Sequence, residues 1–111
     1  MIDFVHLHNH SHYSLLDGAC RIDDLVNEAA KNNMSAIALT DHGCMFGAIE
    51  FYRKARSKKI KPIIGVEAYI APGSRKDRKQ SEGISATSFH LVLLAKNFTG
   101  YQNLMRLVSI G

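Results

Sequence analysis

The fold is signalled most clearly by the stretch Lys61-Pro62-Ile63-Ile64-Gly65-Val66-Glu67-Ala68-Tyr69-Ile70. It is apolar on both sides, a pattern typical of a strand that is buried on both faces of a parallel sheet. Glu67 is the exception, because a carboxylate is costly to bury unless it is paired or bound to a metal. The stretch therefore predicts a strand over 61–70 that carries a candidate site residue.

Strand and helix patterns alternate on both sides of this segment. Period-two alternation and short apolar runs indicate strands, whereas apolar residues three and four apart indicate helices. The predicted strands are 4–10, 35–40, 61–70 and 89–96, and the predicted helices are 21–33, 46–59 and a last one that Thr99 can cap. This order predicts the α/β class, with a mainly parallel sheet of about four strands and flanking helices.

The length and composition are those of one globular domain. The chain has 111 residues, 46% of them hydrophobic and 22% charged, which excludes disordered and fibrous classes. No apolar run is long enough to cross a bilayer, and the start has no secretory signal pattern. The cysteines, Cys20 and Cys44, form no disulfide framework and are expected to be packing residues. We expect a reduced, cytoplasmic protein with no membrane partner.

The positive charge is concentrated in one segment. Ten of the 14 Lys and Arg residues lie between Arg53 and Lys79 with only two acids, so this segment carries +8 and the remainder −4. A basic segment on an acidic domain indicates a nearby polyanion, although a solvated helix face followed by a charged loop explains the charge equally well. Residues 72–88 are predicted to form a long surface loop. The candidates for phosphate or DNA contacts are Arg75, Lys76, Arg78 and Lys79.

Histidine and carboxylate side chains recur along the predicted strands: four lie late in or after a strand, one lies within the fourth strand, and Asp17 is a loop carboxylate that can fold back over the carboxyl end of the strands. In chain order they are His8, His10, Asp17, His42, Glu67 and His90. Loops of parallel α/β sheets converge at that edge, so separate strands deliver these groups to one region. His8 and His10 are two apart on a strand and therefore point the same way. Imidazole together with carboxylate suits Zn, Mn or Fe better than Ca, which predicts a metal site.

Each of these motifs has an ordinary structural explanation when it is taken alone. A lone His-x-His, or an Asp-His after an apolar strand, is often a packing or turn feature, and only the conjunction with Glu67 favours metal binding. His6 lies near the start of its strand and is expected to be a core histidine, whereas His12 is expected to be exposed. Multinuclear sites of this kind serve hydrolytic phosphoryl chemistry, because metals activate water and neutralise phosphate charge. The residues alone therefore predict a metal-dependent phosphoesterase.

The four candidate site segments resemble the motifs of the PHP (polymerase and histidinol phosphatase) family. The resemblance is carried by Phe4 to Gly18, Ala38 to Gly43, Gly65 to Tyr69 and Phe89 to Ala95, and it covers essentially the whole chain. Other stretches are similar to the branch at the N-terminus of the alpha subunit of bacterial replicative DNA polymerases rather than to histidinol phosphatases. These are Tyr13 to Gly18, Phe51-Tyr52 with Ile60 to Gly65, and Lys96-Asn97 with Gly100 to Leu104.

The resemblance implies a distorted barrel of about seven βα units with a trinuclear metal centre at its mouth. Residues 1–111 would be the N-terminal portion of such a domain, without the polymerase domains. The implied ligands of up to three Zn, Mn or Fe ions are His8, His10, Asp17, His42, Glu67 and His90, and Asp41 would orient His42. The implied partners are DNA, the rest of the alpha subunit, a proofreading subunit and other replisome components. A barrel that is cut after four strands exposes an edge, so the isolated chain is expected to self-associate.

Three functions remain open from the sequence. The first is a metal-dependent 3′–5′ exonuclease within a DNA-directed DNA polymerase, a nucleotidyltransferase of DNA replication, with the isolated chain itself inactive. The second is a metal-stapled structural domain that braces the polymerase and docks a separate proofreading subunit. The third and weaker one is a small-molecule phosphatase of the histidinol phosphatase type.

Overall fold

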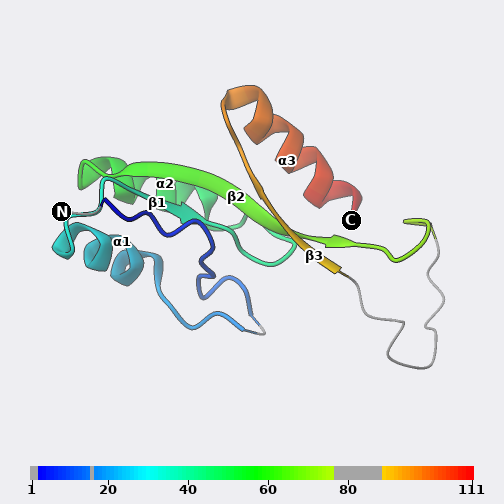
Figure 1. The fold of residues 1–111 in the computed structure, drawn as a ribbon, viewed down its shortest axis with the longest axis horizontal. Coiled ribbons are helices and arrows are strands. Elements are labelled where there is room, and N and C mark those ends of the chain that lie inside the picture. The colour runs from blue at the N-terminus through cyan, green and yellow to red at the C-terminus, as the bar shows by residue number, and fades with distance from the viewer. Residues whose placement is uncertain (1–2, 16, 77–88) are drawn as a thin grey trace.

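A computed structural model describes residues 3–15, 17–76 and 89–111 of the chain. In chain order its elements are helix α1 (Ile22–Lys31), strand β1 (Ala36–Leu39), helix α2 (Ala48–Ser57), strand β2 (Lys61–Ile70), strand β3 (Phe89–Leu94) and helix α3 (Phe98–Ile110) (Figure 1). Their bounds lie within about two residues of those predicted from the sequence. Within the described ranges, no helix has the length and apolar character needed to cross a membrane.

The sheet is built around β2, which is long enough to pair with a different strand along each half. Its first half pairs in parallel with β1, from Ala36 opposite Lys61 to Leu39 opposite Ile64. Its second half pairs antiparallel with β3, from Gly65 opposite Leu94 onward. The α/β class is confirmed, with strand order β1-β2-β3. The antiparallel direction of β3 was not anticipated, and it follows from the absence of a predicted crossover helix between the two strands.

The segment over 4–10, predicted as a strand, does not form one. It runs beside β1 and joins it through Ala38 N donating to His6 O at 3.0 Å and Thr40 N donating to Asn9 O at 2.9 Å. Between these bonds the Asn9 side chain donates from Nδ2 to Ala38 O at 2.9 Å, and Asn9 N donates to Thr40 Oγ1. Side chains thus occupy positions that ladder bonds would fill, and the described sheet has three strands instead of about four.

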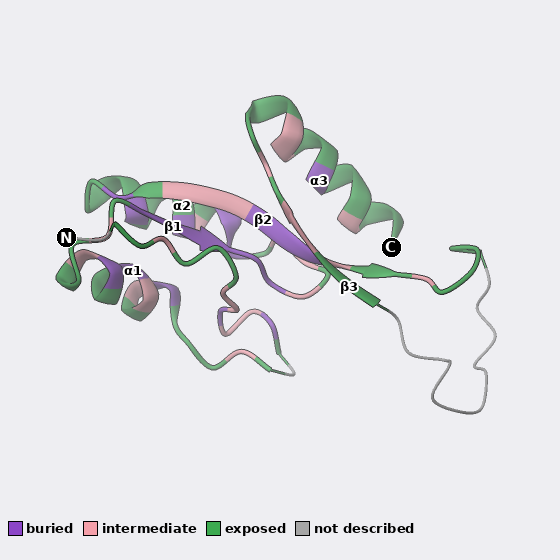
Figure 2. Ribbon diagram, in the orientation of Figure 1, coloured by how far each residue is buried: buried purple, intermediate pink, exposed green. Residues whose placement is uncertain are grey.

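The hydrophobic core lies among α1, α2 and β1. Its buried members are Ile22, Val26, Ala29, Ile37, Leu39, Phe51, Ala55 and Ile60. Figure 2 shows buried residues concentrated in this part of the fold, whereas β3 and α3 are largely exposed. Large apolar side chains on these two elements remain open to solvent, among them Phe89, Leu91, Phe98, Leu107 and Ile110. These side chains are exposed apolar area, whereas the self-association predicted from an uncovered sheet edge and helix face stays a prediction.

Three side chains outside the metal cluster have environments that differ from prediction. His6 is exposed instead of buried, because its segment is not a strand within the sheet. Cys20 is exposed, because it lies in the turn before α1. His12 is half-buried, with its ring 4.3 Å from that of Tyr13. Cys44 is half-buried as a packing residue would be, and burial raises the pKa of its thiol.

Helix α3 is capped by Asn97 instead of Thr99. The Asn97 backbone is extended, and its Oδ1 accepts a hydrogen bond from Gly100 N at 3.0 Å. We expect Asn97→Ala to lower the free energy of unfolding by about 1 kcal/mol, because it leaves a first-turn N–H without its cap. Urea denaturation followed by circular dichroism measures this loss. Thr99→Ala is the matched control and should leave stability nearly unchanged; an equal loss in both variants would contradict the Asn97 cap.

Candidate metal centre

Six candidate ligands converge from five parts of the fold onto one region. His8 and His10 come from the extended segment beside β1, and Asp17 comes from the turn that precedes α1. His42 lies three residues beyond the end of β1 and forms a parallel bridge with Glu67 of β2. His90 comes from β3, where it stands opposite Tyr69. The six are His8, His10, Asp17, His42, Glu67 and His90, the set named from the sequence.

Glu67 is the centre of the cluster. Its Oε2 lies 2.6 Å from His8 Nε2, 2.5 Å from His10 Nε2 and 3.7 Å from His42 Nε2. Its Oε1 lies 2.9 Å from His90 Nδ1. The Glu67 side chain is only 6% exposed, whereas those of His8 and His90 are about half exposed. One buried carboxylate is therefore shared by four imidazole rings, two of which border solvent.

A second carboxylate, that of Asp17, joins the other side of the cluster. Asp17 Oδ2 lies 2.6 Å from His42 Nε2 and 3.0 Å from His10 Nδ1. The Asp17 side chain is 38% exposed, so it borders the open side of the site. His10 contacts Glu67 through one ring nitrogen and Asp17 through the other, and thereby links the two carboxylates.

The charge state of Glu67 suits a cation. Burial raises the pKa of the Glu67 carboxyl, but the hydrogen bonds with His8, His10 and His90, together with the nearby His42, outweigh it and lower the pKa to about 2. The carboxylate is therefore ionised at neutral pH. Metal ligands must be deprotonated to bind, so Glu67 is already in its binding form.

The donor atoms fit bound metal ions. They form three overlapping trios, and within each trio the ligand atoms lie within 4.8 Å of one another. The trios are His8–His10–Glu67, His10–Asp17–His42 and His42–Glu67–His90. Ligands at about 2.1 Å from one tetrahedral ion are roughly 3.4 Å apart, so the closest pairs, at 2.5 and 2.6 Å, would separate by less than about 1 Å to hold an ion. Nitrogen and carboxylate donors in this combination suit Zn, Mn or Fe.

Within the described residues, Asp41 makes no side-chain hydrogen bond with His42, the residue that the family resemblance implied it would orient. Its carboxylate accepts hydrogen bonds from Ser11 N at 2.5 Å and Ser11 Oγ at 2.7 Å. His42 Nδ1 is buried without a hydrogen-bond partner among the described residues, while His42 N donates to Ser14 Oγ at 2.8 Å. The sequence analysis missed Ser11 and Ser14. A buried Asp41 needs donors, but no sequence pattern shows which ones supply them.

Tyr69 is a neighbour of the site that the sequence analysis also missed. Its ring lies 5.7 Å from that of His42 in a stacked arrangement and 5.1 Å from that of His90 edge-on. Tyr69 is two residues from Glu67 on β2, and the period of two places both on one face of the strand. That spacing was available in the sequence as a signal.

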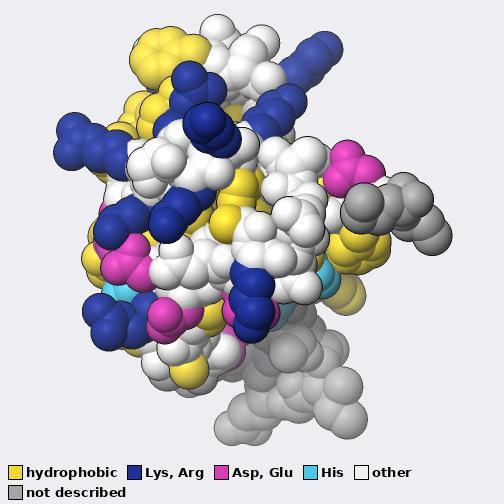
Figure 3. Space-filling model, turned by 90° about the vertical axis from the view of Figure 1, so that its left-hand side faces the viewer, with side chains coloured by type: hydrophobic (Ala, Val, Ile, Leu, Met, Phe, Trp, Pro, Cys, Tyr) yellow, Lys and Arg dark blue, Asp and Glu magenta, His cyan; other side chains and the backbone are white. Residues whose placement is uncertain are grey.

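The basic segment is divided between two ends of β2. Lys61 begins β2 and Glu67 lies six residues later, about 20 Å along a strand that rises about 3.3 Å per residue. Figure 3, which faces the end of the molecule where β2 begins, shows Lys and Arg side chains intermixed with Asp and Glu on this face. Lys54 of α2 is paired with Asp23 of α1 at 2.7 Å.

The predicted phosphate contacts lie beyond the other end of β2. Arg75 and Lys76 follow its carboxyl end, the end nearer Glu67, and both are exposed. Arg78 and Lys79, with the rest of the predicted loop from residue 77 to 88, lie outside the described residues. Of the four predicted phosphate contacts, Arg75 and Lys76 are the two that lie within the described residues.

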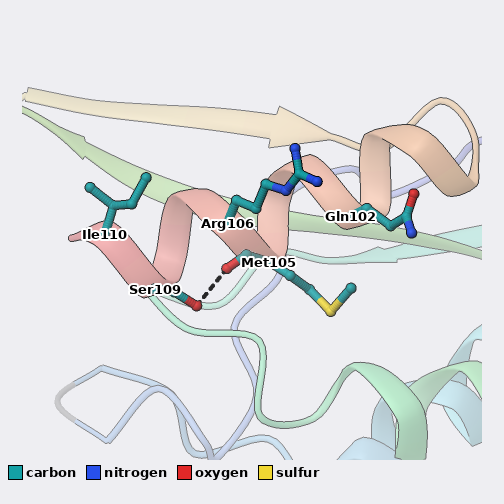
Figure 4. A pocket seen from close by; sticks show the side chains of 5 residues that line it. All are labelled: Gln102, Met105, Arg106, Ser109 and Ile110. Carbon is teal, nitrogen blue, oxygen red and sulfur yellow. Dashed lines mark hydrogen bonds between the residues drawn. The ribbon is translucent and has the colours of Figure 1, made fainter.

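A hollow on α3 is separate from the cluster. It is lined by Gln102, Met105, Arg106, Ser109 and Ile110 (Figure 4). Ser109 Oγ donates to Met105 O at 2.8 Å, so this hydroxyl is already used within the helix. Among the described residues that line the hollow there is no His, Asp or Glu, and thus no imidazole or carboxylate to serve as a metal ligand or general base.

Comparison with known proteins identifies the family of the chain. The sequence matches the PHP domain family over residues 6–111. The chain belongs to the PHP family. It is 58% identical over 108 residues to the DNA polymerase III subunit alpha of Borreliella burgdorferi and 54% identical over 110 residues to that of Thermus aquaticus. Both alignments cover 97% of this chain and 9% of the relative, so the chain spans about a tenth of their length.

One solved structure also resembles the chain. It is an amidohydrolase from Chromobacterium violaceum, determined with bound SO4 and no metal, with a TM-score of 0.61 and 25% sequence identity. The likeness covers 92% of this chain and 32% of that one. The predicted PHP family and the predicted similarity to the replicative polymerase branch are thus both confirmed.

Proposed function

We propose that the Glu67 cluster binds up to three divalent Zn, Mn or Fe ions and hydrolyses phosphodiester bonds, as a 3′–5′ exonuclease would. The observation that carries this proposal is the set of three ligand trios sharing His10, His42 and Glu67. The relatives named above are subunits of a DNA polymerase, which supports DNA as the substrate. Polymerisation is proposed only for a longer alpha subunit that includes this segment, because the chain spans 9% of those relatives.

Each part of the site has a role in this proposal. Bound divalent ions would activate water and neutralise charge on the phosphate. The ionised Glu67 carboxylate supplies negative charge at the centre, where cations would be held. The exposed sides of His8 and His90 leave an approach for a phosphate group. Arg75 and Lys76 place positive charge beyond the same end of β2, where it would attract a DNA backbone.

A structural role is the second candidate, and one observation favours it. Three of the six ligands come from segments outside the sheet: His8 and His10 from residues 4–10, which lie beside β1 without forming a strand, and Asp17 from a turn. Ions held by the cluster would cross-link these segments and stabilise the folded chain. In that case the domain would brace the polymerase, and its partners would be the rest of the alpha subunit, a separate proofreading subunit and other replisome components.

The first test is the metal content of the purified 111-residue chain. We expect near-stoichiometric Zn, Mn or Fe by elemental mass spectrometry, and a fall of about 10 °C in Tm after chelation. A ligand at about 100 times its Kd stabilises by about 2.7 kcal/mol, which corresponds to a shift of that size in a domain of this length. A folded chain that carries no metal above background, even after incubation with each ion, would contradict the site.

The second test separates chemistry from bracing. Residues 1–111 would replace the matching segment of the Thermus aquaticus alpha subunit, with hydrolysis of a DNA 3′ end as the readout. We expect His10→Ala to reduce hydrolysis by at least about 100-fold while polymerase activity is retained and Tm falls no further than chelation lowers it. His6→Ala is the matched control, because His6 is an exposed histidine outside the cluster.

The other outcomes of that test decide between the candidates. A joint loss of polymerase activity and thermal stability in His10→Ala, without any hydrolysis in the unmodified chimera, would favour the brace. A chimera that binds metal and hydrolyses no DNA would contradict the exonuclease.

A further inference from the structure

Asp41 and Ser11 form a closed, buried pair beside the metal cluster. Ser11 is fully buried and Asp41 is 1% exposed. Both carboxylate oxygens of Asp41 are occupied by one residue, since Ser11 N donates to Oδ1 and Ser11 Oγ donates to Oδ2. A buried carboxylate is costly unless it is satisfied in this way, so the pairing fixes where residue 11 lies relative to the end of β1.

Ser11 in turn organises the turn that carries Asp17. Its Oγ accepts from Tyr13 N at 3.2 Å and its backbone O accepts from Ser14 N at 3.0 Å. Ser14 O then accepts from Asp17 N at 3.2 Å and from Gly18 N at 2.8 Å. A Cβ at Gly18 would lie 1.9 Å from Ser11 O, which shows how tightly the turn closes on itself.

A second hydrogen bond reaches the same turn from His42, the residue that follows Asp41. His42 N donates to Ser14 Oγ at 2.8 Å, and Ser14 is buried. Asp41 and His42 thus hold the turn at Ser11 and Ser14, immediately after β1. Asp17, by contrast, is exposed and touches the cluster only through His10 and His42 among the described contacts. The position of Asp17 therefore depends on the hydrogen bonds that Asp41 and His42 make with Ser11 and Ser14.

We propose that Asp41 is a positioning residue that acts through Ser11, holding the turn so that Asp17 completes the His10–Asp17–His42 trio. This inference rests on the proposed function, because the trio matters only if the cluster binds metal. Residues that orient metal ligands typically change affinity by 10- to 100-fold when they are replaced. Asp41 would act on Asp17 and not on the His42 ring, whose Nδ1 has no partner in the described part of the chain.

Hydrogen exchange of the metal-free chain tests whether Asp41 and Ser11 hold the turn that carries Asp17, and it requires no metal. Ser11→Ala removes the hydroxyl that joins Asp41 to Tyr13 N, and Asp41→Asn is a second variant in case the first fails to fold. We expect the amides of Ser14, Asp17 and Gly18 to exchange faster in the variants while those of β2 are unchanged. The matched control is Ser35→Ala, since Ser35 Oγ makes the same kind of bond to Asp3 on the exposed side. Equal exchange rates of these turn amides in wild type and variants would overturn the proposal that Asp41 holds the turn through Ser11.

Titration with Zn2+ tests the consequence for the cluster. We expect Ser11→Ala to weaken the affinity of one bound ion by 10- to 100-fold, and Ser35→Ala to leave it unchanged. In a chain that already carries Asp17→Ala, Ser11→Ala should cause no further loss, because both changes act through one ligand. An additional loss in the double variant would assign Ser11 a merely structural role and overturn the proposal.

The two measurements also separate this inference from the proposed function. A wild-type chain that binds no Zn2+ contradicts the proposed function, while the exchange result still decides whether Asp41 holds the turn. A chain that binds Zn2+ with equal affinity in wild type and Ser11→Ala contradicts the positioning role and leaves the metal site standing.

Discussion

Replacing Glu67 with glutamine should reduce the Zn2+ affinity of the chain by more than about 100-fold. Glutamine keeps the shape of the side chain but removes the negative charge that contacts His8, His10 and His90. Glu67 belongs to two of the three trios, so the change affects more of the cluster than the loss of any residue that belongs to one. Partners that only orient ligands change affinity by 10- to 100-fold, and a ligand should exceed them. Isothermal titration with Zn2+ measures the change.

The matched control for this prediction is Glu28→Gln. Glu28 is an exposed residue of α1 in an i,i+3 pair with Lys31 at 3.6 Å, and it belongs to none of the three ligand trios. It loses the same charge, so it corrects for the net charge of the chain, and it should bind Zn2+ as the wild type does. Unchanged affinity in Glu67→Gln, with a folded chain by circular dichroism, would mean that the ions bind elsewhere.

Glu67 is an example of a site residue whose strand and neighbours could be predicted from the sequence. A carboxylate within an apolar strand stands out, and the bounds of β2 match the prediction at both ends. The spacing of His42 after one strand and Glu67 within the next placed both at one edge of the sheet, and the parallel bridge between them agrees. These inferences depend on the periodicity of apolar residues and on the order of the elements along the chain, and both can be read directly in the sequence.

The strand predicted over 4–10 shows where such reasoning fails. Its alternation of His with apolar residues is a strand pattern, and the segment does lie beside β1. The pattern gives no indication that the Asn9 side chain bonds to Ala38 O and His6 O in place of a regular ladder. Competition between side-chain and backbone hydrogen bonds is decided by the local geometry and not by periodicity.

Asp41 has another hydrogen-bond partner than the one that the family resemblance implied. The resemblance assigned Asp41 to the orientation of His42, the next residue of the chain. Successive side chains of an extended backbone point to opposite sides, so Asp41 faces Ser11 while His42 faces Asp17 and Glu67. The basic segment was treated as one surface in the same way, although β2 separates Lys61 from Arg75. In both cases the sequence gives the separation of the residues along the chain, but not where their side chains lie in space.

Adding one methyl group at Gly65 should destabilise the chain and disconnect His90 from the cluster. A Cβ at this position would lie 2.6 Å from Leu93 O, 2.8 Å from Leu94 Cδ2 and 2.9 Å from Thr40 Cγ2. Leu93 O belongs to the backbone of β3, so relief requires β3 to move away from β2 near Leu94, the partner of Gly65. Overpacking of this kind costs about 3 kcal/mol, which lowers Tm by about 12 °C or more in a domain of this length.

The same displacement should be visible in metal binding, because His90 is carried by β3 and reaches Glu67 Oε1 at 2.9 Å. Differential scanning calorimetry of Gly65→Ala measures the stability, and Zn2+ titration should show one ion bound more weakly. Gly100→Ala is the matched control: its Cβ would meet only Ala95 at 3.4 Å or more, and alanine favours the α3 helix by up to about 1 kcal/mol. The identical chemical change should thus raise stability in α3 and lower it in β2. A Gly65→Ala chain as stable as the wild type would show that β3 is not held against β2 as closely as described, and the His42–Glu67–His90 trio would lose its support.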